Sequence, residues 1–249
     1  MIKKVITIIL LVSIGSVYSQ VNRDIHAVYS FYNLNNGKEQ VVNLYISKEK
    51  AFSEFLIKVQ VNDTLFIDDE DTINFKVEPK DSIGKQYYIE GQLITFRDII
   101  YEKSEFKEVI VEEVIPDYNW DLKSQAKKIG EFNCNLATLE FRGRNYNVWY
   151  TTDIATPFGP WKFYGLPGLI VVAETADKSI KFQLKSIKSN SIKELEIPKQ
   201  GKKITFKEYV NFKHNEVNDY IEKLKSKLPR GAVVKINSRN STHLEKDYK

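Results

Sequence analysis

The residues of this sequence that could act as nucleophiles, general bases or metal ligands are few and widely spaced. There is one cysteine, Cys134, and the three histidines, His26, His214 and His243, lie far apart along the chain. The sequence contains no His-Glu-x-x-His, no Gly-x-Ser-x-Gly and no phosphate-binding glycine loop. A catalytic thiol and its histidine meet in space, so an envelope hydrolase or thiol enzyme using Cys134 stays an alternative. The sequence as a whole favours a protein without a catalytic centre.

The single cysteine excludes a disulfide within the chain. Cys134 lies in the stretch Phe132-Asn133-Cys134-Asn135-Leu136, where apolar and polar residues alternate. In a strand this alternation directs Cys134 to the same face as Phe132 and Leu136. We therefore expect a buried thiol that behaves as a small apolar residue.

An acidic run, Asp68-Asp69-Glu70-Asp71, could in principle bind a hard cation through its carboxylates. It lacks the spaced ligands and the glycine of a calcium loop, and it fits the tip of a charged hairpin. We predict no metal ion and no cofactor.

The formal net charge is +4, and the excess of lysines follows Lys178. These lysines are interspersed with acidic residues, a pattern typical of solvated surfaces. No nucleic-acid-binding module is recognisable, so nucleic acid is not an expected partner.

A rigid aromatic loop runs from Gly159 to Ile170, with three glycines, two prolines and three aromatic residues in twelve positions. Glycine permits positive φ and proline fixes φ, so such a loop has a defined shape. Aromatic residues and arginines on a rigid rim are typical of binding sites. A strong alternative is an aromatic plug in the open end of a half-barrel, with Arg144 paired to Asp153. The predicted binding residues are Arg142, Arg144, Trp149, Tyr150, Trp161, Phe163, Tyr164 and Leu166, and the predicted turn residues are Gly159, Pro160, Gly165, Pro167 and Gly168.

The segment Gly165-Leu166-Pro167-Gly168-Leu169-Ile170 resembles the motif of the GLPGLI family, secreted proteins of Bacteroidota-type bacteria. The similarity extends from about Trp120 to Ala173. It departs from the family pattern at 155–158 and at Trp161-Lys162. The family has no established biochemical activity, so the resemblance implies export more than a reaction. Further matching positions are Ile129-Gly130, Cys134, Ala137, Gly143-Arg144-x-Tyr146, Trp149-Tyr150-Thr151-x-Asp153-Ile154 and Gly159-Pro160.

Residues 1–19 have the anatomy of a secretory signal peptide. Two lysines, Lys3 and Lys4, precede an apolar run over 5–14, and small residues precede Gln20. The run is too short to span a bilayer, so we expect an exported protein that does not span the membrane. Its expected location is the periplasm or the outer-membrane periphery. We predict one β-rich domain over 20–237 and a polar tail over 238–249.

Short strand-like segments separated by turn signals predict a mainly β fold. The clearest is 179–188, where Ile180, Phe182 and Leu184 alternate with polar residues. Successive strands are expected to be neighbours in an antiparallel meander that forms a curved sheet or incomplete barrel. Thr205 and Glu208 have the spacing of a capping box and predict a C-terminal helix, covering one side of the sheet, to about residue 228.

Together these features favour a secreted, non-enzymatic binding module of the bacterial cell envelope. Its ligand would be apolar or amphipathic, or else a protein partner, held at the surface built from residues 142–170. A structural or accessory role in an outer-membrane transport complex is an alternative. The sequence names neither ligand nor oligomeric state.

Overall fold

The computed structural model describes residues 24–34, 37–57, 64–67, 73–76, 81–103, 105–189, 194–227 and 244–248. The expected signal peptide over 1–19 and the acidic run over 68–71 lie outside these residues. Among the residues described, no helix is both long and apolar enough to cross a membrane.

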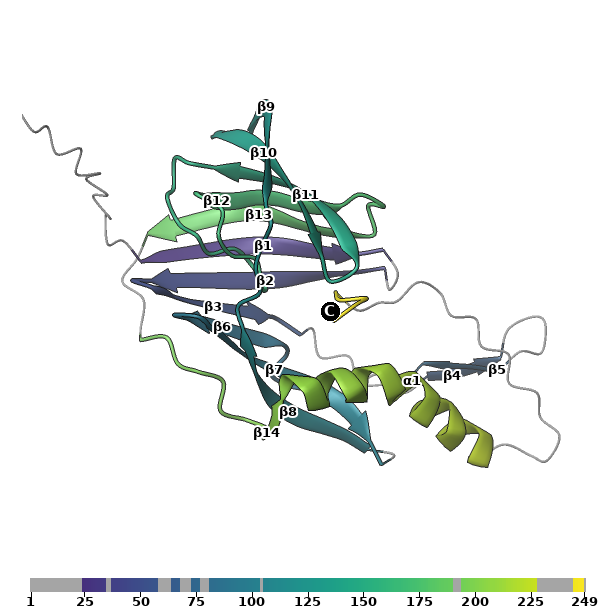
Figure 1. Cartoon of the computed structure of the whole chain (residues 1–249). Coiled ribbons are helices and arrows are strands. Elements are labelled where there is room, and N and C mark those ends of the chain that lie inside the picture. Colours follow the sequence, from purple (N-terminus) through teal and green to yellow (C-terminus); the bar gives the residue numbers. More distant parts are fainter. Residues whose placement is uncertain are drawn as a thin grey trace, which may run out of the picture.

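The described chain is mainly β, as the sequence predicts. It forms one open sheet of twelve strands, a separate two-stranded hairpin and one helix (Figure 1). The elements are β1 (Ile25–Asn33), β2 (Lys38–Ser47), β3 (Lys50–Phe55), β4 (Thr64–Ile67), β5 (Ile73–Lys76), β6 (Gln86–Glu90), β7 (Leu93–Glu102), β8 (Glu105–Val114), β9 (Asp121–Ile129), β10 (Phe132–Phe141), β11 (Arg144–Thr151), β12 (Leu169–Thr175), β13 (Ile180–Ser189), β14 (Lys202–Thr205) and α1 (Phe206–Lys227).

Two antiparallel meanders make up the large sheet. Its strand order is β14-β8-β7-β6-β3-β2-β1-β13-β12-β11-β10-β9, with β4 and β5 in the small hairpin. The first meander runs outward from β1 to β8, and the second runs from the other edge at β9 back to the centre at β13. The pairing of β1 with β13 joins the two halves. β14 departs from the predicted antiparallel pattern, because it pairs with β8 in parallel.

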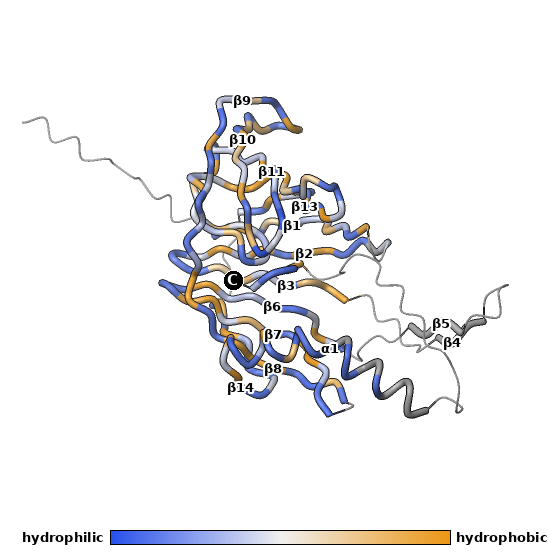
Figure 2. Tube along the Cα trace, turned by 45° about the vertical axis from the view of Figure 1, so that its right-hand side comes forward, coloured by the Kyte–Doolittle hydropathy of each residue, from blue (hydrophilic) through white to orange (hydrophobic). Residues whose placement is uncertain are grey.

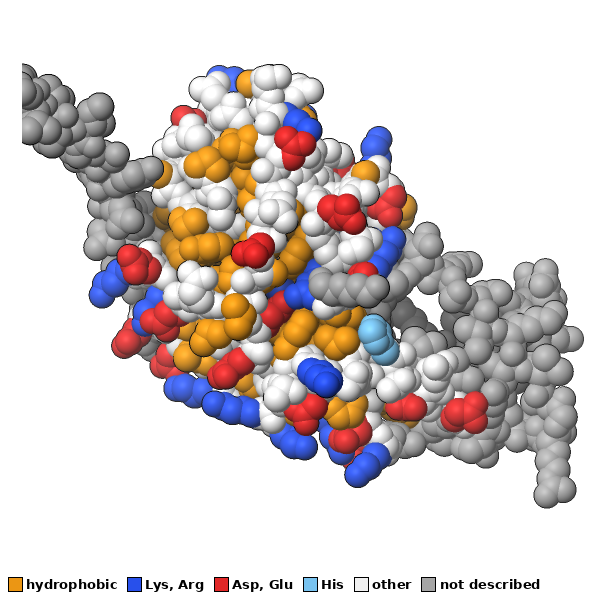
Figure 3. Space-filling model, viewed as in Figure 1, with side chains coloured by type: hydrophobic (Ala, Val, Ile, Leu, Met, Phe, Trp, Pro, Cys, Tyr) orange, Lys and Arg blue, Asp and Glu red, His pale blue; other side chains and the backbone are white. Residues whose placement is uncertain are grey.

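The curved sheet has an inner face that carries the core. Alternate residues of β1, among them Ala27, Tyr29 and Phe31, are buried on this face. In β13, Ile180 and Phe182 point the same way, as their alternation predicts. Figure 2 shows the corresponding alternation of hydrophobic and hydrophilic residues along the strands, and Figure 3 shows hydrophobic side chains gathered over the middle of the face viewed, with charged side chains around them. Residues between these inward positions line the outer face.

The helix α1 packs on the inner face over β7. The ring of Tyr209 meets Phe96 edge-on at 5.1 Å, and its hydroxyl donates to Asp98 at 2.7 Å. The predicted capping box is present. The backbone N–H of Glu208 donates to Thr205 Oγ1 at 3.2 Å, and that of Thr205 donates to the Glu208 carboxylate at 2.7 Å.

The end of the chain also packs inside the domain. Residues 238–249 were expected to form a polar tail, but the part that the structure describes, 244–248, contains a buried leucine and a buried glutamate, Leu244 and Glu245. Tyr248 packs against Phe206 and Tyr209 of α1, with ring centroids 6.3 Å and 6.1 Å apart. This short segment lies between the helix and the upper strands in Figure 1.

Candidate functional site

The structure places most of the predicted binding residues in the interior. Six of the eight, all except Trp149 and Tyr164, are buried. The loop between β11 and β12 folds back across the inner face of the sheet, so its aromatic residues fill the half-barrel. This arrangement matches the aromatic plug that the sequence allowed as an alternative. The six buried residues are Arg142, Arg144, Tyr150, Trp161, Phe163 and Leu166.

Trp161 is the centre of this plug, with 1% of its surface exposed. Its ring contacts Phe141, Tyr146 and Phe163, with centroids between 5.2 and 6.4 Å away. Its backbone N–H donates to Ser53 Oγ on β3 at 3.2 Å, which fixes the loop to the opposite half of the sheet. The loop therefore connects the two meanders through their common core.

The predicted turn residues fit this close packing. A Cβ atom on Gly168 would lie 2.0 Å from the carbonyl oxygen of Thr151, so only glycine fits. Gly165 has a φ of +96°, which L side chains rarely adopt, and its N–H donates to the Pro157 carbonyl at 2.8 Å. These glycines shape the loop.

A cluster of buried charges lies beside the plug. The Glu113 carboxylate accepts from Arg142 and from Lys162 Nζ, the latter at 2.6 Å. Lys162 also pairs with Glu245 at 2.6 Å, and its Nζ lies 4.2 Å from the centroid of the Phe96 ring. All four charged groups are at least nine-tenths buried. Buried charges are tolerated when they are paired in this way.

Arg144 has different partners from the one that the sequence suggested. Its guanidinium donates to the Leu244 carbonyl at 3.0 Å and to Ser179 Oγ at 3.2 Å. Arg144 begins β11, whereas Asp153 follows the end of that eight-residue strand. At about 3.3 Å per residue the strand separates them by far more than ion-pair distance. The suggested Arg144–Asp153 pair is therefore wrong.

The two more exposed candidates, Trp149 and Tyr164, face different surroundings. The Trp149 ring lies under Lys127 of β9, with Nζ 3.9 Å from its centroid. The carbonyl of Tyr164 accepts from the Trp120 indole at 2.9 Å, in the connection from β8 to β9. These two residues therefore contact elements outside the buried plug.

Cys134 is 1% exposed on β10, as its alternation predicts. Its thiol donates weakly to the Phe132 carbonyl at 3.7 Å, and burial raises the pKa of that thiol. Of the described histidines, His26 bonds Asn43 at 3.1 Å and His214 packs against the Tyr248 ring. This environment does not activate a nucleophile.

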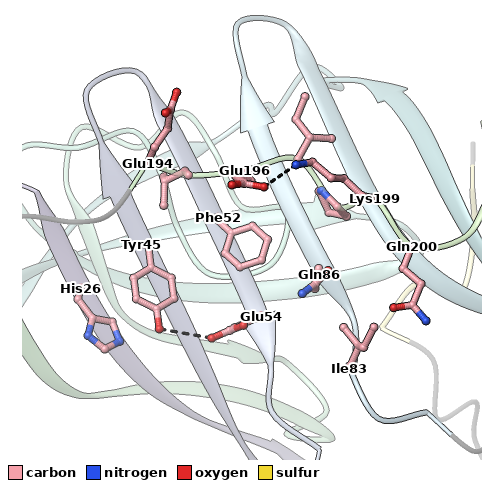
Figure 4. A pocket seen from close by; sticks show the side chains of 13 residues that line it. His26, Tyr45, Phe52, Glu54, Ile83, Gln86, Glu194, Glu196, Lys199 and Gln200 are labelled. Carbon is pink, nitrogen blue, oxygen red and sulfur yellow. Dashed lines mark hydrogen bonds and ion pairs between the residues drawn. The ribbon is translucent and has the colours of Figure 1, made fainter.

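An open groove of about 680 Å³ lies on the outer face of the sheet (Figure 4), and none of the predicted site residues lines it. Its floor is a row of rings on adjacent strands. His26 of β1 stacks on Tyr45 of β2 with centroids 4.4 Å apart, and Tyr45 faces Phe52 of β3 at 6.4 Å. One wall is the segment 194–200, which leads to β14. Ile83 and Gln86 also line the groove.

A hydrogen-bond network fixes a carboxylate beside this floor. Oε1 of Glu54 accepts from Asn43 Nδ2 at 3.1 Å and from the Tyr45 hydroxyl at 3.3 Å. Asn43 is in turn held by His26. Partial burial and the Glu54 carboxylate raise the pKa of the Tyr45 hydroxyl, which keeps it protonated as a donor. Three strands thus position one half-buried acid.

The wall of the groove adds further acidic groups. Glu194 and Glu196 are exposed there, and Lys199 pairs with Glu196 at 2.6 Å. With Glu54, the lining carries three carboxylates and one lysine. This excess of negative charge contrasts with the formal net charge of +4 of the whole chain.

Sequence reasoning missed the groove because its parts are distant in the chain. Its floor depends on the register that sets Tyr45 opposite both His26 and Phe52. The period-two pattern of these strands gives the face of each side chain but not the register between strands. Among the described residues, no group of three or more His, Cys, Asp or Glu side chains is arranged to hold a metal ion.

No protein-family model matches this sequence, and no curated protein matches it. Two solved structures of PNGF-II, in the P21 and C2 space groups, are similar to it with TM-scores of 0.52 and 0.51. The identity is 15% in both, and the matches cover 76% of this chain. They cover 33% and 32% of the PNGF-II chains, so this chain spans about a third of their length. At this identity the likeness shows a shared β-rich fold.

Proposed function

We propose that this protein is a non-enzymatic binding module, and that its ligand site is the groove on the outer face of the sheet. The observation that carries the proposal is the open row of His26, Tyr45 and Phe52 with the fixed carboxylate of Glu54 beside it. Concave sites that combine apolar surface with a few placed polar groups are the usual form of ligand sites. The surface at 142–170, favoured by the sequence, is mostly core.

The chemistry of the groove favours an amphipathic ligand with a cationic group. The faces of Tyr45 and Phe52 offer apolar area and attract cations through their ring electrons. The acidic groups Glu54, Glu194 and Glu196 complement a positive charge. A short alkyl or aromatic body bearing an amine satisfies both requirements.

The resemblance to the GLPGLI family supports a place for this module in the cell envelope. An exported protein with a signal peptide over 1–19 would meet its ligand in the periplasm or at the outer-membrane periphery. Both the family assignment and the location are part of the proposal. Edman sequencing or mass spectrometry of the protein secreted by its own host tests them, with Gln20 expected as the first residue.

An accessory role through pairing of sheet edges has less support. The edge strand β9 is largely exposed, but it carries Lys123, Lys127 and Lys128. Lysines on an edge strand protect it against pairing with another chain. A thiol enzyme is also disfavoured, because Cys134 is buried.

Calorimetry with a matched pair of amphiphiles tests the groove. We expect decyltrimethylammonium, below its micellar concentration, to bind at least tenfold more tightly than decanesulfonate, which has the same chain and the opposite charge. Phe52→Ala should weaken the cation's binding by removing part of the floor. Glu54→Gln keeps the shape but removes the charge, and should reduce the preference for the cation.

Glu140→Gln is the matched control, because Glu140 is exposed on β10, outside the groove. It should leave binding of both amphiphiles unchanged. Equal affinity for the two amphiphiles, or binding that survives Phe52→Ala, would count against the proposed site. Native mass spectrometry of protein purified gently from its own envelope would then identify the natural ligand.

A further inference from the structure

The segment 244–248 lies on the inner face of the sheet like a peptide in a binding site. Its backbone is held at the turn between β10 and β11, where the N–H groups of Lys246 and Asp247 donate to the Arg142 carbonyl at 2.9 Å and 3.2 Å. A Cβ atom on Gly143 would lie only 3.1 Å from Lys246 Cβ, so this glycine allows the close approach.

The side chains of the segment enter sites formed by other elements. Leu244 is buried, and its carbonyl accepts from Arg144 of β11. Tyr248 enters an aromatic site on α1, where it contacts Phe206, Tyr209 and His214. The segment thus combines an apolar residue, an acid and an aromatic residue three positions after the acid.

Glu245 completes the charge balance of the interior. Without it, the buried cluster would contain two cations, Arg142 and Lys162, and one anion, Glu113. Its carboxylate, 7% exposed, neutralises the excess through Lys162. One oxygen of Glu245 and Nε of Arg142 are buried without a hydrogen-bond partner among the described residues. The rest of the fold therefore presents a cationic site that an acidic segment fills incompletely.

Arg142 occupies a position that the turn itself does not favour. Arg142 and Gly143 have φ values of +51° and +71° and form a two-residue hairpin turn. Asn-Gly is the preferred pair for such a turn, because a residue with a larger side chain is strained at positive φ. An arginine at this position makes the turn less stable than asparagine would, but it forms an ion pair with Glu113.

We propose that this cationic and aromatic cradle is a peptide-recognition site, and that the C-terminal segment of a second copy of this chain can replace the chain's own segment in it. The cradle is defined by Arg142, Gly143, Arg144, Lys162 and Tyr209. The second copy would then contribute a Glu245 side chain to the buried charge cluster. The site is separate from the outer groove.

The test uses full-length chains and a labelled peptide of residues 244–249 as the substitute for a second copy. Glu245→Gln removes the charge that pairs with Lys162 and so weakens the binding of the chain's own segment in the cradle, while the side chain keeps its shape. This variant should bind the peptide at least tenfold more tightly than the unaltered chain, whose own segment competes at high effective concentration. A peptide with glutamine in place of its glutamate should bind at least tenfold more weakly.

Two further substitutions in the Glu245→Gln chain identify the site. Arg142→Asn suits the turn but removes the guanidinium, so it should abolish peptide binding. Glu54→Gln should leave peptide binding unchanged, which separates the cradle from the acidic groove. The proposal would be overturned if the folded Glu245→Gln chain did not bind the peptide. It would also be overturned if the chain with both Glu245→Gln and Arg142→Asn still bound it.

Hydrogen exchange on the unaltered chain provides an independent measurement if Glu245→Gln does not fold. A replaceable segment must open locally, so the amide protons of Lys246 and Asp247 should exchange at least a hundredfold faster than those in the centre of β12. Exchange of both sets only through global unfolding would show a segment fixed in the fold, and the proposal would be wrong.

Discussion

Trp161 combines an unfavourable backbone conformation with nearly complete burial. Its φ is +62°, a region that costs about 1–2 kcal/mol for a residue with a side chain. The contacts of its ring with Phe141, Tyr146 and Phe163 offset this cost. Trp161, one of the eight predicted binding residues, is therefore the central core residue of its loop.

Trp161→Ala should accordingly destabilise the protein by about 3–5 kcal/mol, the usual cost of truncating a buried tryptophan. Urea denaturation followed by circular dichroism measures this change. Leu122→Ala is the control, because Leu122 is 56% exposed on β9 and its truncation should change the unfolding free energy by about 0.5 kcal/mol or less. A stable Trp161→Ala protein would show that the loop is not part of the core.

Cys134 permits a simple test of the alternative thiol-enzyme function. Because burial raises the pKa of this thiol, it should react with Ellman's reagent at neutral pH only when the protein unfolds. The labelling rate should rise together with the unfolded fraction in urea. Rapid stoichiometric labelling of the folded protein would restore the enzyme hypothesis.

Among the elements, α1 is fixed to the sheet through a buried carboxylate on β7. Asp98 accepts from the Tyr209 hydroxyl and pairs with Lys85 at 3.0 Å, while Lys213 Nζ lies 3.9 Å away. Burial alone would raise the pKa of this carboxyl. The two lysines and the hydrogen bonds from Tyr209 and the Ile99 N–H outweigh burial and hold the pKa well below its usual value.

This lowered pKa predicts how stability depends on pH. A carboxyl whose pKa is depressed in the folded state stabilises the fold above its unfolded pKa of about 3.8, and that contribution is lost as the pH falls toward the folded pKa. Asp98→Asn should therefore lower the free energy of unfolding by about 3 kcal/mol at pH 7, because it removes the buried carboxylate that pairs with Lys85 and faces Lys213. The difference in unfolding free energy between the Asp98→Asn variant and the unaltered chain should become smaller below pH 4.

Urea titrations of both chains at pH 7 and pH 3 measure this dependence. Tyr209→Phe is the control, because it removes one hydrogen bond but keeps the charges, and should cost about 1 kcal/mol at both pH values. A penalty for Asp98→Asn that is equal at pH 7 and pH 3 would contradict the assigned role of the carboxylate.

At the scale of the whole molecule, local pattern predicts the elements and long-range register determines the site. The alternation in β13, the burial of Cys134 and the Thr205–Glu208 capping box all follow from neighbouring residues, and all are confirmed. The outer groove depends on pairings between β1, β2 and β3 and on the distant segment 194–200. Local periodicity contains no information on such pairings, so the site could not be predicted.

The buried end of the chain escaped prediction for a similar reason. A polar composition is typical of a solvated tail, and 244–248 includes Glu245, Lys246 and Asp247. Glu245 is nevertheless buried because Arg142 and Lys162 supply cationic charge in the interior. Only the three-dimensional arrangement reveals that an acidic residue is needed there.

The central pairing of β1 with β13 has a consequence for how this chain reaches its native state. Ile25 pairs with Ser189, so the middle of the sheet joins residues more than 150 positions apart. Contacts this distant in sequence slow folding, because the entropy of closing a long loop opposes them. While the chain emerges from a ribosome or translocon, β1 has one free edge until β13 appears. Each meander can form its hairpins early, whereas the sheet is joined late, so the unpaired edge of β1 is open to pairing with another chain during that interval.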